Sequence, residues 1–169
     1  MPRGPEADAT QLLVAVGRIS LGGANLELRA SLLAAAALGL PQRVGLYLLG
    51  RESASRALDH AREALEVADD CDGRAQALAW IARAGDAYRR RNELMHGVVG
   101  ADSNGGLRRV RIRRSLTGPT YDEEAIELTA IVALGELLDA VAHDFDHEVT
   151  SALIRDLSYT RAALGHPDN

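Results

Sequence analysis

Apolar residues recur three or four positions apart over most of this chain, which is the spacing of one face of a helix. The first such segment is the longest, and proline, glycine and serine residues separate the others. The pattern predicts helices over about Thr10 to Leu38, about Arg43 to Leu49, Ser53 or Ser55 to Ala68, about Arg74 to Val98, and Asp122 to about Leu157. Gly22-Gly23 would either kink the first helix or let another helix approach it closely.

One segment has a different period. From Leu107 to Leu116 apolar and charged residues alternate, as in a strand with one exposed face. The glycine-rich residues 101–106 precede it and are typical of a turn, so we expect this strand to pair with Val98-Val99. The fold class predicted is therefore mainly α: an antiparallel helical bundle of about four long helices, with a small β-hairpin after the helix that ends near Val98.

Length and composition favour a single domain over residues 1–169, with flexible ends at 1–9 and 160–169. Hydrophobic residues make up 47% of the chain and aromatic residues only 4%, a mixture that suits close helix packing. The start of the chain lacks the apolar segment of a signal peptide, and the apolar run Ser31 to Leu40 is too short to span a bilayer. We expect a cytoplasmic protein without membrane contact. Cys71 is the one cysteine and cannot form an internal disulfide.

Basic residues are concentrated in one part of an acidic chain. Between Arg89 and Leu116 there are eight arginines and two acidic residues, a net charge of +6 where the whole chain has −5. Such a cluster could bind the phosphates of a nucleic acid. A solvated edge strand whose charges discourage aggregation explains the same pattern equally well. The candidate phosphate-binding residues are Arg89, Arg90, Arg108 and Arg109.

A polar pair interrupts the apolar face of the helix that ends near Val98. Asn92 and His96 lie one turn apart, in the stripe that also contains Ile81 and Tyr88. Buried polar groups without partners are costly, so the pair requires an explanation. Either both side chains are satisfied within the core, or this face opens onto a cleft where Arg91, Asn92 and His96 meet a phosphate.

The motif Arg91-Asn92-x-x-x-His96, placed near the end of a long helix, resembles the HEPN superfamily. Gly97 after the histidine, and Val16-Gly17-Arg18 and Leu26-Glu27 in the first helix, add to this resemblance. The resemblance covers nearly the whole chain in architecture and these short stretches in specific residues. Many HEPN proteins keep the fold without catalysis, and position 98 is valine where some toxin members have a tyrosine that is modified.

The resemblance implies metal-independent RNA cleavage by a homodimer, without a cofactor, and a role as a toxin or defence component with a cognate antitoxin. Carried onto this chain, His96 would be the general acid or base, Arg91 would clamp the phosphate, and Asn92 would orient it. Glu27 would support the site by orienting Arg91 or His96. The expected product is a 2′,3′-cyclic phosphate.

Two other functions compete with this one. The first is a non-catalytic helical interaction or nucleotide-binding module on the same scaffold. The second is a metal-binding hydrolase that uses His143 and His147, which are spaced to chelate a metal ion. Because the apolar stripe of that helix lies on the opposite side, we expect these histidines to be solvated and predict no metal site. His60 is expected at the surface too.

Overall fold

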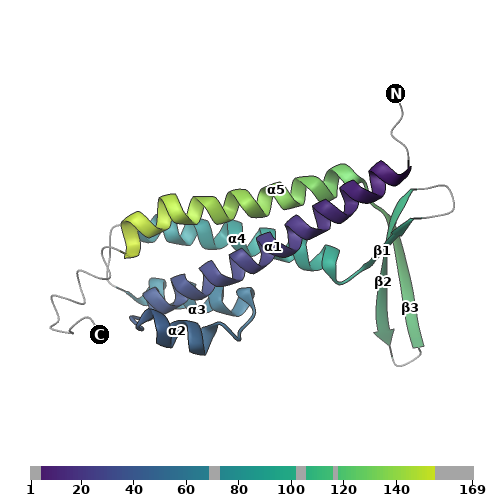
Figure 1. Ribbon diagram of the computed structural model, residues 1–169. Helices are drawn as coiled ribbons and strands as arrows, with labels where there is room; N and C mark the ends of the chain where they lie inside the picture. Colours follow the sequence, from purple (N-terminus) through teal and green to yellow (C-terminus); the bar gives the residue numbers. More distant parts are fainter. Residues whose placement is uncertain (1–4, 69–72, 102–105, 116–117, 155–169) are drawn as a thin grey trace.

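The computed structural model describes residues 5–68, 73–101, 106–115 and 118–154. Within these ranges the chain is mainly helical, and a small antiparallel sheet of three strands stands at one end of the helices (Figure 1). In chain order the elements are α1 (Pro5–Ala37), α2 (Gln42–Leu49), α3 (Ala54–Val67), α4 (Arg74–Met95), β1 (Val98–Ala101), β2 (Leu107–Ser115), β3 (Gly118–Ala125), α5 (Leu128–Asp144) and the π-helix η1 (Phe145–Ile154).

The mainly α prediction is confirmed, but a bundle of about four long helices is not. In the described part of the chain α1, α4 and α5 have 33, 22 and 17 residues, whereas α2 and α3 have 8 and 14. Residues 5–9 belong to α1, and the flexible end at 1–9 stays a prediction. The end predicted at 160–169 lies outside the described residues. Ser53 caps α3 by accepting a hydrogen bond from the Arg56 backbone N–H.

α1 packs against α2, α3, α4 and α5 and is continuous across its paired glycines. A Cβ built on Gly22 would lie 2.8 Å from the Cβ of Leu138 on α5, so the two helices approach closely at this point. The predicted close approach is therefore confirmed, and the predicted kink is not needed. Small and aliphatic side chains fill the core around α1, among them Ile19, Leu26, Ala30, Leu33 and Leu138, all fully buried.

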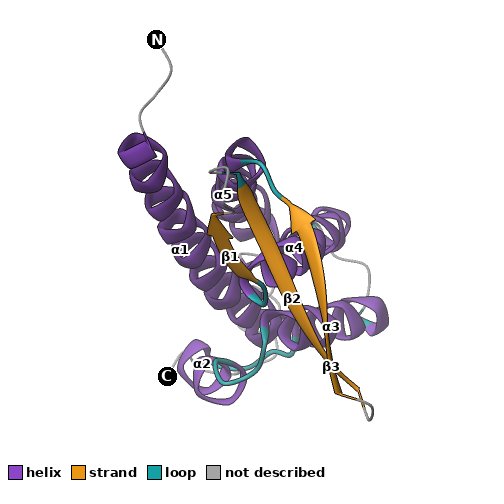
Figure 2. Ribbon diagram, turned by 90° about the vertical axis from the view of Figure 1, so that its right-hand side faces the viewer, coloured by secondary structure: helices purple, strands orange, loops and turns teal. Residues whose placement is uncertain are grey.

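The sheet has the order β1-β2-β3, and β1 pairs with β2 in the register Val98↔Val110. This is the hairpin that the alternating pattern predicts. The third strand was not predicted. Asp122 was expected to begin a helix, but it lies within β3 and the helix begins at Leu128. Figure 2 shows β2 lying between β1 and β3.

Charge complementarity between strands explains why β3 forms. Arg109 lies opposite Glu124 in the β2–β3 register and the two form an ion pair. Arg108 pairs with Glu123 at 3.6 Å. Acidic residues that would favour a helix N-terminus in isolation are thus used to pair a strand of arginines, because opposite charges across strands stabilise a sheet.

One arginine fixes the sheet to the helices. The Arg109 side chain is only 12% exposed, and its Nη1 donates a hydrogen bond of 2.9 Å to the backbone oxygen of Glu93, near the end of α4. A Cβ on Gly97 would lie 2.6 Å from the Arg109 Cγ, so the absence of a side chain at position 97 lets Arg109 pass. The hairpin therefore has a defined position beside the last turn of α4.

The last helix runs through α5 and continues as η1 to Ile154, and the predicted end at Leu157 lies outside the described residues. Trp80 of α4 packs against Phe145 at the junction, with ring centroids 4.8 Å apart. Its indole N–H donates a hydrogen bond of 2.8 Å to the Val141 backbone oxygen. Among the described helices, none combines the length and the apolar character that crossing a bilayer requires.

Candidate functional site

A pocket of about 610 Å³ opens between α3, α4 and β2. The α3 residues that line it recur at intervals of three and four, and so do those of α4, so each helix presents one line of side chains. The lining consists of Ser55, Leu58, Asp59 and Arg62 from α3, Gly85, Arg89, Asn92 and Glu93 from α4, His96 directly after it, and Arg111 and Ile112 from β2.

The polar pair of the motif lies in this pocket. His96 is exposed and Asn92 is half-buried, and both line the pocket wall. His96 is the C-cap of α4, and its backbone N–H donates a hydrogen bond of 3.0 Å to the backbone oxygen of Asn92. Of the two explanations open at the sequence level, the geometry favours a face that opens onto a cleft. The His96 side chain is therefore accessible to a molecule bound in the pocket.

Arg91 lies on a different side of α4 from the pocket. Its side chain is directed at α1, where a Cβ on Gly23 would lie 2.8 Å from the Arg91 Nε. Its Nη1 donates a hydrogen bond of 2.9 Å to the Asn92 Oδ1. Arg91 does not belong to the described pocket lining. The structure therefore joins Arg91 to Asn92 and places Asn92 and His96 in one pocket, without bringing all three side chains into it.

Glu27 contacts Tyr88 rather than Arg91 or His96. The Tyr88 hydroxyl donates a hydrogen bond of 2.6 Å to the Glu27 Oε1, and the Arg91 guanidinium carbon lies 5.6 Å from the centre of the Tyr88 ring. Burial and the Glu27 carboxylate raise the pKa of Tyr88 above its usual value. Tyr88 thus contacts both Glu27 and Arg91, and the support of the site by Glu27 stays a prediction.

The four arginines expected to bind RNA phosphates all have acidic partners. Arg89 pairs with Asp86 at 2.5 Å and with Glu93 at 3.1 Å. Arg90 pairs with Asp86 at 2.8 Å, and Arg108 and Arg109 pair with acids of β3. The hydrogen bond from Arg89 is the main reason why the pKa of Asp86 is lowered.

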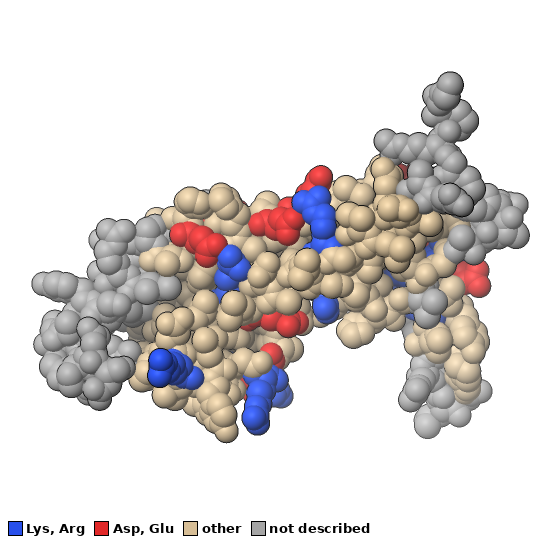
Figure 3. Space-filling view, viewed as in Figure 1, with Lys and Arg blue, Asp and Glu red and all other residues tan. Residues whose placement is uncertain are grey.

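The three acidic residues of β3 therefore offset part of the net charge of +6 that residues 89–116 carry. On the face drawn in Figure 3, acidic and basic side chains lie interspersed and form no continuous basic patch. Of the four candidates only Arg89 lines the described pocket, and Arg109 has the structural role given above.

The pocket also contains residues that the sequence did not single out. Arg111 lines it from β2, and its Nη2 lies 3.9 Å from the Glu93 Oε2. Arg62 of α3 lines it too and pairs with Asp59 at 3.4 Å. Ser55, Asp59 and Arg62 are spaced to share one face of α3, and this spacing was the sequence pattern that could have indicated a polar pocket wall. It becomes informative only when α3 is known to pack beside α4.

The histidines proposed for a metal site lie on the surface. His143 and His147 are exposed, and their ring centroids are 4.4 Å apart. No group of three or more histidine, cysteine, aspartate or glutamate side chains arranged to hold a metal ion occurs in the part of the chain that the structure describes. His60 is exposed, as predicted, and Cys71 lies outside the described residues.

Comparisons with protein-family models, with curated proteins and with solved structures found no match to this chain.

Proposed function

We propose that this chain is a metal-independent endoribonuclease of the HEPN type that acts as a homodimer. The observation that carries the proposal is the position of Asn92 and His96. Both line one open pocket, together with Arg89 and Arg111. A histidine on an accessible pocket wall beside guanidinium groups is what phosphodiester cleavage by acid–base catalysis needs.

In the proposed reaction the 2′-hydroxyl of a ribose attacks the adjacent phosphorus. A base removes the proton of that hydroxyl, and an acid protonates the 5′-oxygen as the P–O bond to it breaks. The products are a 2′,3′-cyclic phosphate and a 5′-hydroxyl end. His96 is the group in the pocket suited to move these protons, and Asn92 would orient the phosphate through its amide N–H donors.

The proton balance of this reaction supports the homodimer, which the HEPN resemblance implies. A single imidazole cannot accept one proton and donate another in the same step, whereas two copies of His96 could divide the roles. We therefore propose a composite site in which the pockets of two chains face one another. The remaining parts of the proposal are a role as a toxin or defence component and an antitoxin as protein partner, and they rest on the HEPN resemblance of the Arg91-Asn92-x-x-x-His96 motif.

One observation favours a second candidate, a non-catalytic interaction or nucleotide-binding module. Arg91 is directed at α1 and is held between Gly23, Tyr88 and Asn92. In this position its guanidinium contacts Tyr88 and Asn92, and the phosphate would be bound by other side chains. A module of this kind would bind RNA or a nucleotide in the pocket without cleaving it.

The deciding experiment compares the wild type with His96→Ala on mixed RNA in EDTA. His60→Ala is the matched control, because His60 is an exposed histidine of α3 that does not line the described pocket. We expect the wild type and His60→Ala to leave 2′,3′-cyclic phosphate ends. We expect His96→Ala to cleave RNA about 10²- to 10⁴-fold more slowly. Equal cleavage by all three, or by none, would favour the second candidate.

A further inference from the structure

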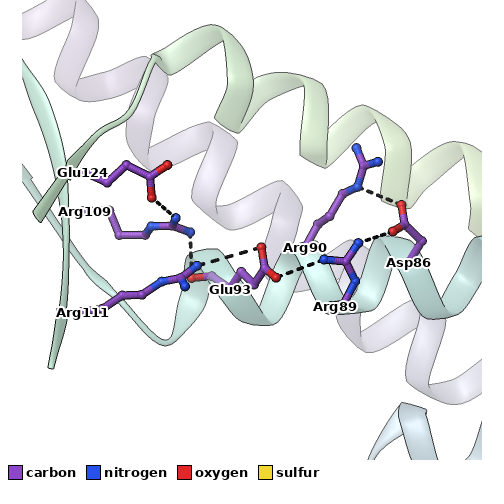
Figure 4. A network of polar contacts seen from close by, with 7 residues as sticks. All are labelled: Asp86, Arg89, Arg90, Glu93, Arg109, Arg111 and Glu124. Atoms are coloured by element: carbon purple, nitrogen blue, oxygen red, sulfur yellow. Dashed lines mark hydrogen bonds and ion pairs between the residues drawn. The ribbon is translucent and has the colours of Figure 1, made fainter. Parts of the chain in front are cut away.

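One carboxylate occupies the space between two arginines of the pocket. The Glu93 Oε1 accepts a hydrogen bond of 3.1 Å from the Arg89 Nη1, and the Glu93 Oε2 lies 3.9 Å from the Arg111 Nη2 (Figure 4). The two arginines come from different elements, α4 and β2. Each carboxylate oxygen thus faces one guanidinium, an arrangement that the two non-bridging oxygens of a phosphodiester would satisfy equally well.

The contact between Glu93 and Arg111 is easily exchanged. At 3.9 Å it is an ion pair and not a hydrogen bond. The side chains of Glu93 and Arg111 are 44% and 34% exposed, and ion pairs with this access to water are weak. Glu93 can rotate into solvent without leaving a buried charge unpaired. Its backbone oxygen, which holds Arg109, does not move when the side chain rotates.

Two other arginines near the motif, Arg109 and Arg91, are less suited to bind a ligand. Arg109 is 12% exposed and holds both Glu124 and the backbone of α4 (Figure 4). Arg91 is directed at Gly23 of α1 and bound to Asn92. Arg89 and Arg111, in contrast, line the same pocket as His96. Arg89 belongs to α4, the helix that carries the motif, and Arg111 belongs to β2.

We propose that Arg89 and Arg111 form a phosphate site for single-stranded RNA, and that Glu93 occupies this site when RNA is absent. The proposal deepens the ribonuclease proposal and rests on it for the identity of the ligand. It assigns phosphate binding to Arg111 of the hairpin, and it assigns Arg91 to positioning Asn92. Glu93 then acts as a competing carboxylate that RNA must displace.

The test measures binding separately from cleavage. A fluorescent 2′-O-methyl oligonucleotide lacks the attacking hydroxyl, so its anisotropy reports binding alone. We expect Arg111→Gln to weaken binding about tenfold, and to reduce the slope of log affinity against log salt by about 0.7, the value for one phosphate contact on a single strand. We expect Glu93→Gln to tighten binding by about two- to fivefold, because the competing charge is removed.

Glu52→Gln is the matched control. Glu52 forms a similar exposed ion pair, 3.1 Å from Arg56, and neither residue lines the described pocket. The control changes the net charge by the same amount, so a general electrostatic effect would appear in it as well. Partial unfolding would weaken RNA binding and cannot explain tighter binding by Glu93→Gln. The test therefore remains informative if Arg111→Gln loses stability.

Equal binding by Glu93→Gln and Glu52→Gln, or an unchanged salt slope in Arg111→Gln, would overturn the proposed phosphate site. In that case the ribonuclease proposal still stands if the wild type cleaves RNA in a His96-dependent way. If both variants behave as expected and no His96-dependent cleavage occurs, the phosphate site is supported and the catalytic proposal fails.

Discussion

Replacing Gly22 with alanine would introduce a methyl group into the contact between α1 and α5. That methyl carbon would lie 2.8 Å from the Leu138 Cβ and 3.5 Å from the Asp139 Oδ1. Carbon atoms in contact are normally about 3.5–4.0 Å apart, so the helices would have to separate by about 1 Å. Leu138 Cβ is attached directly to the backbone, and a rotamer change of Leu138 cannot move it away.

The size of the effect follows from a comparison with Gly17, which lies in the same helix. A Cβ on Gly17 would meet no atom within 4 Å. Alanine in place of glycine inside a helix stabilises it by about 1 kcal/mol, and this gain applies to both positions. Forcing a methyl group into a packed contact costs about 1–3 kcal/mol. We therefore expect Gly17→Ala to stabilise the protein by about 1 kcal/mol and Gly22→Ala to be about 1–3 kcal/mol less stable than Gly17→Ala.

The assay is urea unfolding of the two variants and the wild type, followed by circular dichroism. For a chain of this size 1 kcal/mol corresponds to about 2–4 °C in melting temperature, so thermal unfolding should separate the variants by about 2–12 °C. Taking the difference between two Gly→Ala variants removes their common effect on the unfolded chain. If their free energies of unfolding agree within about 0.5 kcal/mol, the close approach of α1 and α5 at Gly22 is wrong.

Three further changes test other contacts. Arg109→Gln removes the hydrogen bond to the Glu93 backbone and should lower the free energy of unfolding by about 1–3 kcal/mol. Amide hydrogen exchange should accelerate more in β2 than in α4, and an equal increase in both elements would contradict the anchoring role of Arg109. The raised pKa of Tyr88 means that the folded state favours the protonated phenol. The contribution of Tyr88 to the free energy of unfolding is therefore fully present below the unfolded pKa of 10.0, and it is lost as the pH rises through the folded pKa. The melting temperature of the wild type should thus fall more steeply above pH 10 than that of Tyr88→Phe, and parallel curves would refute the raised pKa that burial and the Glu27 carboxylate cause. Ser53→Ala removes the N-cap of α3 and should cost about 0.5–2 kcal/mol in urea unfolding, and an unchanged midpoint would show that the cap contributes little.

Local patterns predicted most of the helices and the first hairpin because these elements depend on residues near in sequence. The fourth predicted helix was placed at about Arg74 to Val98 and ends at Met95, and the strand over Leu107 to Leu116 is observed at Leu107–Ser115. In both cases a regular period of apolar residues marks the element.

β3 and the pocket depend on tertiary contacts, and no local pattern contains them. The acidic residues that begin at Asp122 are compatible with a helix start and with a strand. The strand is favoured because these residues lie opposite the arginines of β2. Arg111 was part of the predicted strand, but its place in the pocket requires that the sheet lie beside the end of α4. The direction of Arg91 toward α1 depends in turn on the space left by Gly23.

The position of Trp80 has a practical consequence. It is the one tryptophan of the sequence, it is fully buried against Phe145, and it does not line the described pocket. Its fluorescence is therefore a native signal for the integrity of the helical core alone. Detachment of the hairpin from α4 should leave this emission unchanged, whereas separation of α4 from α5 should shift it to longer wavelength. The protein thus carries an intrinsic probe that distinguishes local opening at the pocket from global unfolding, without any added label.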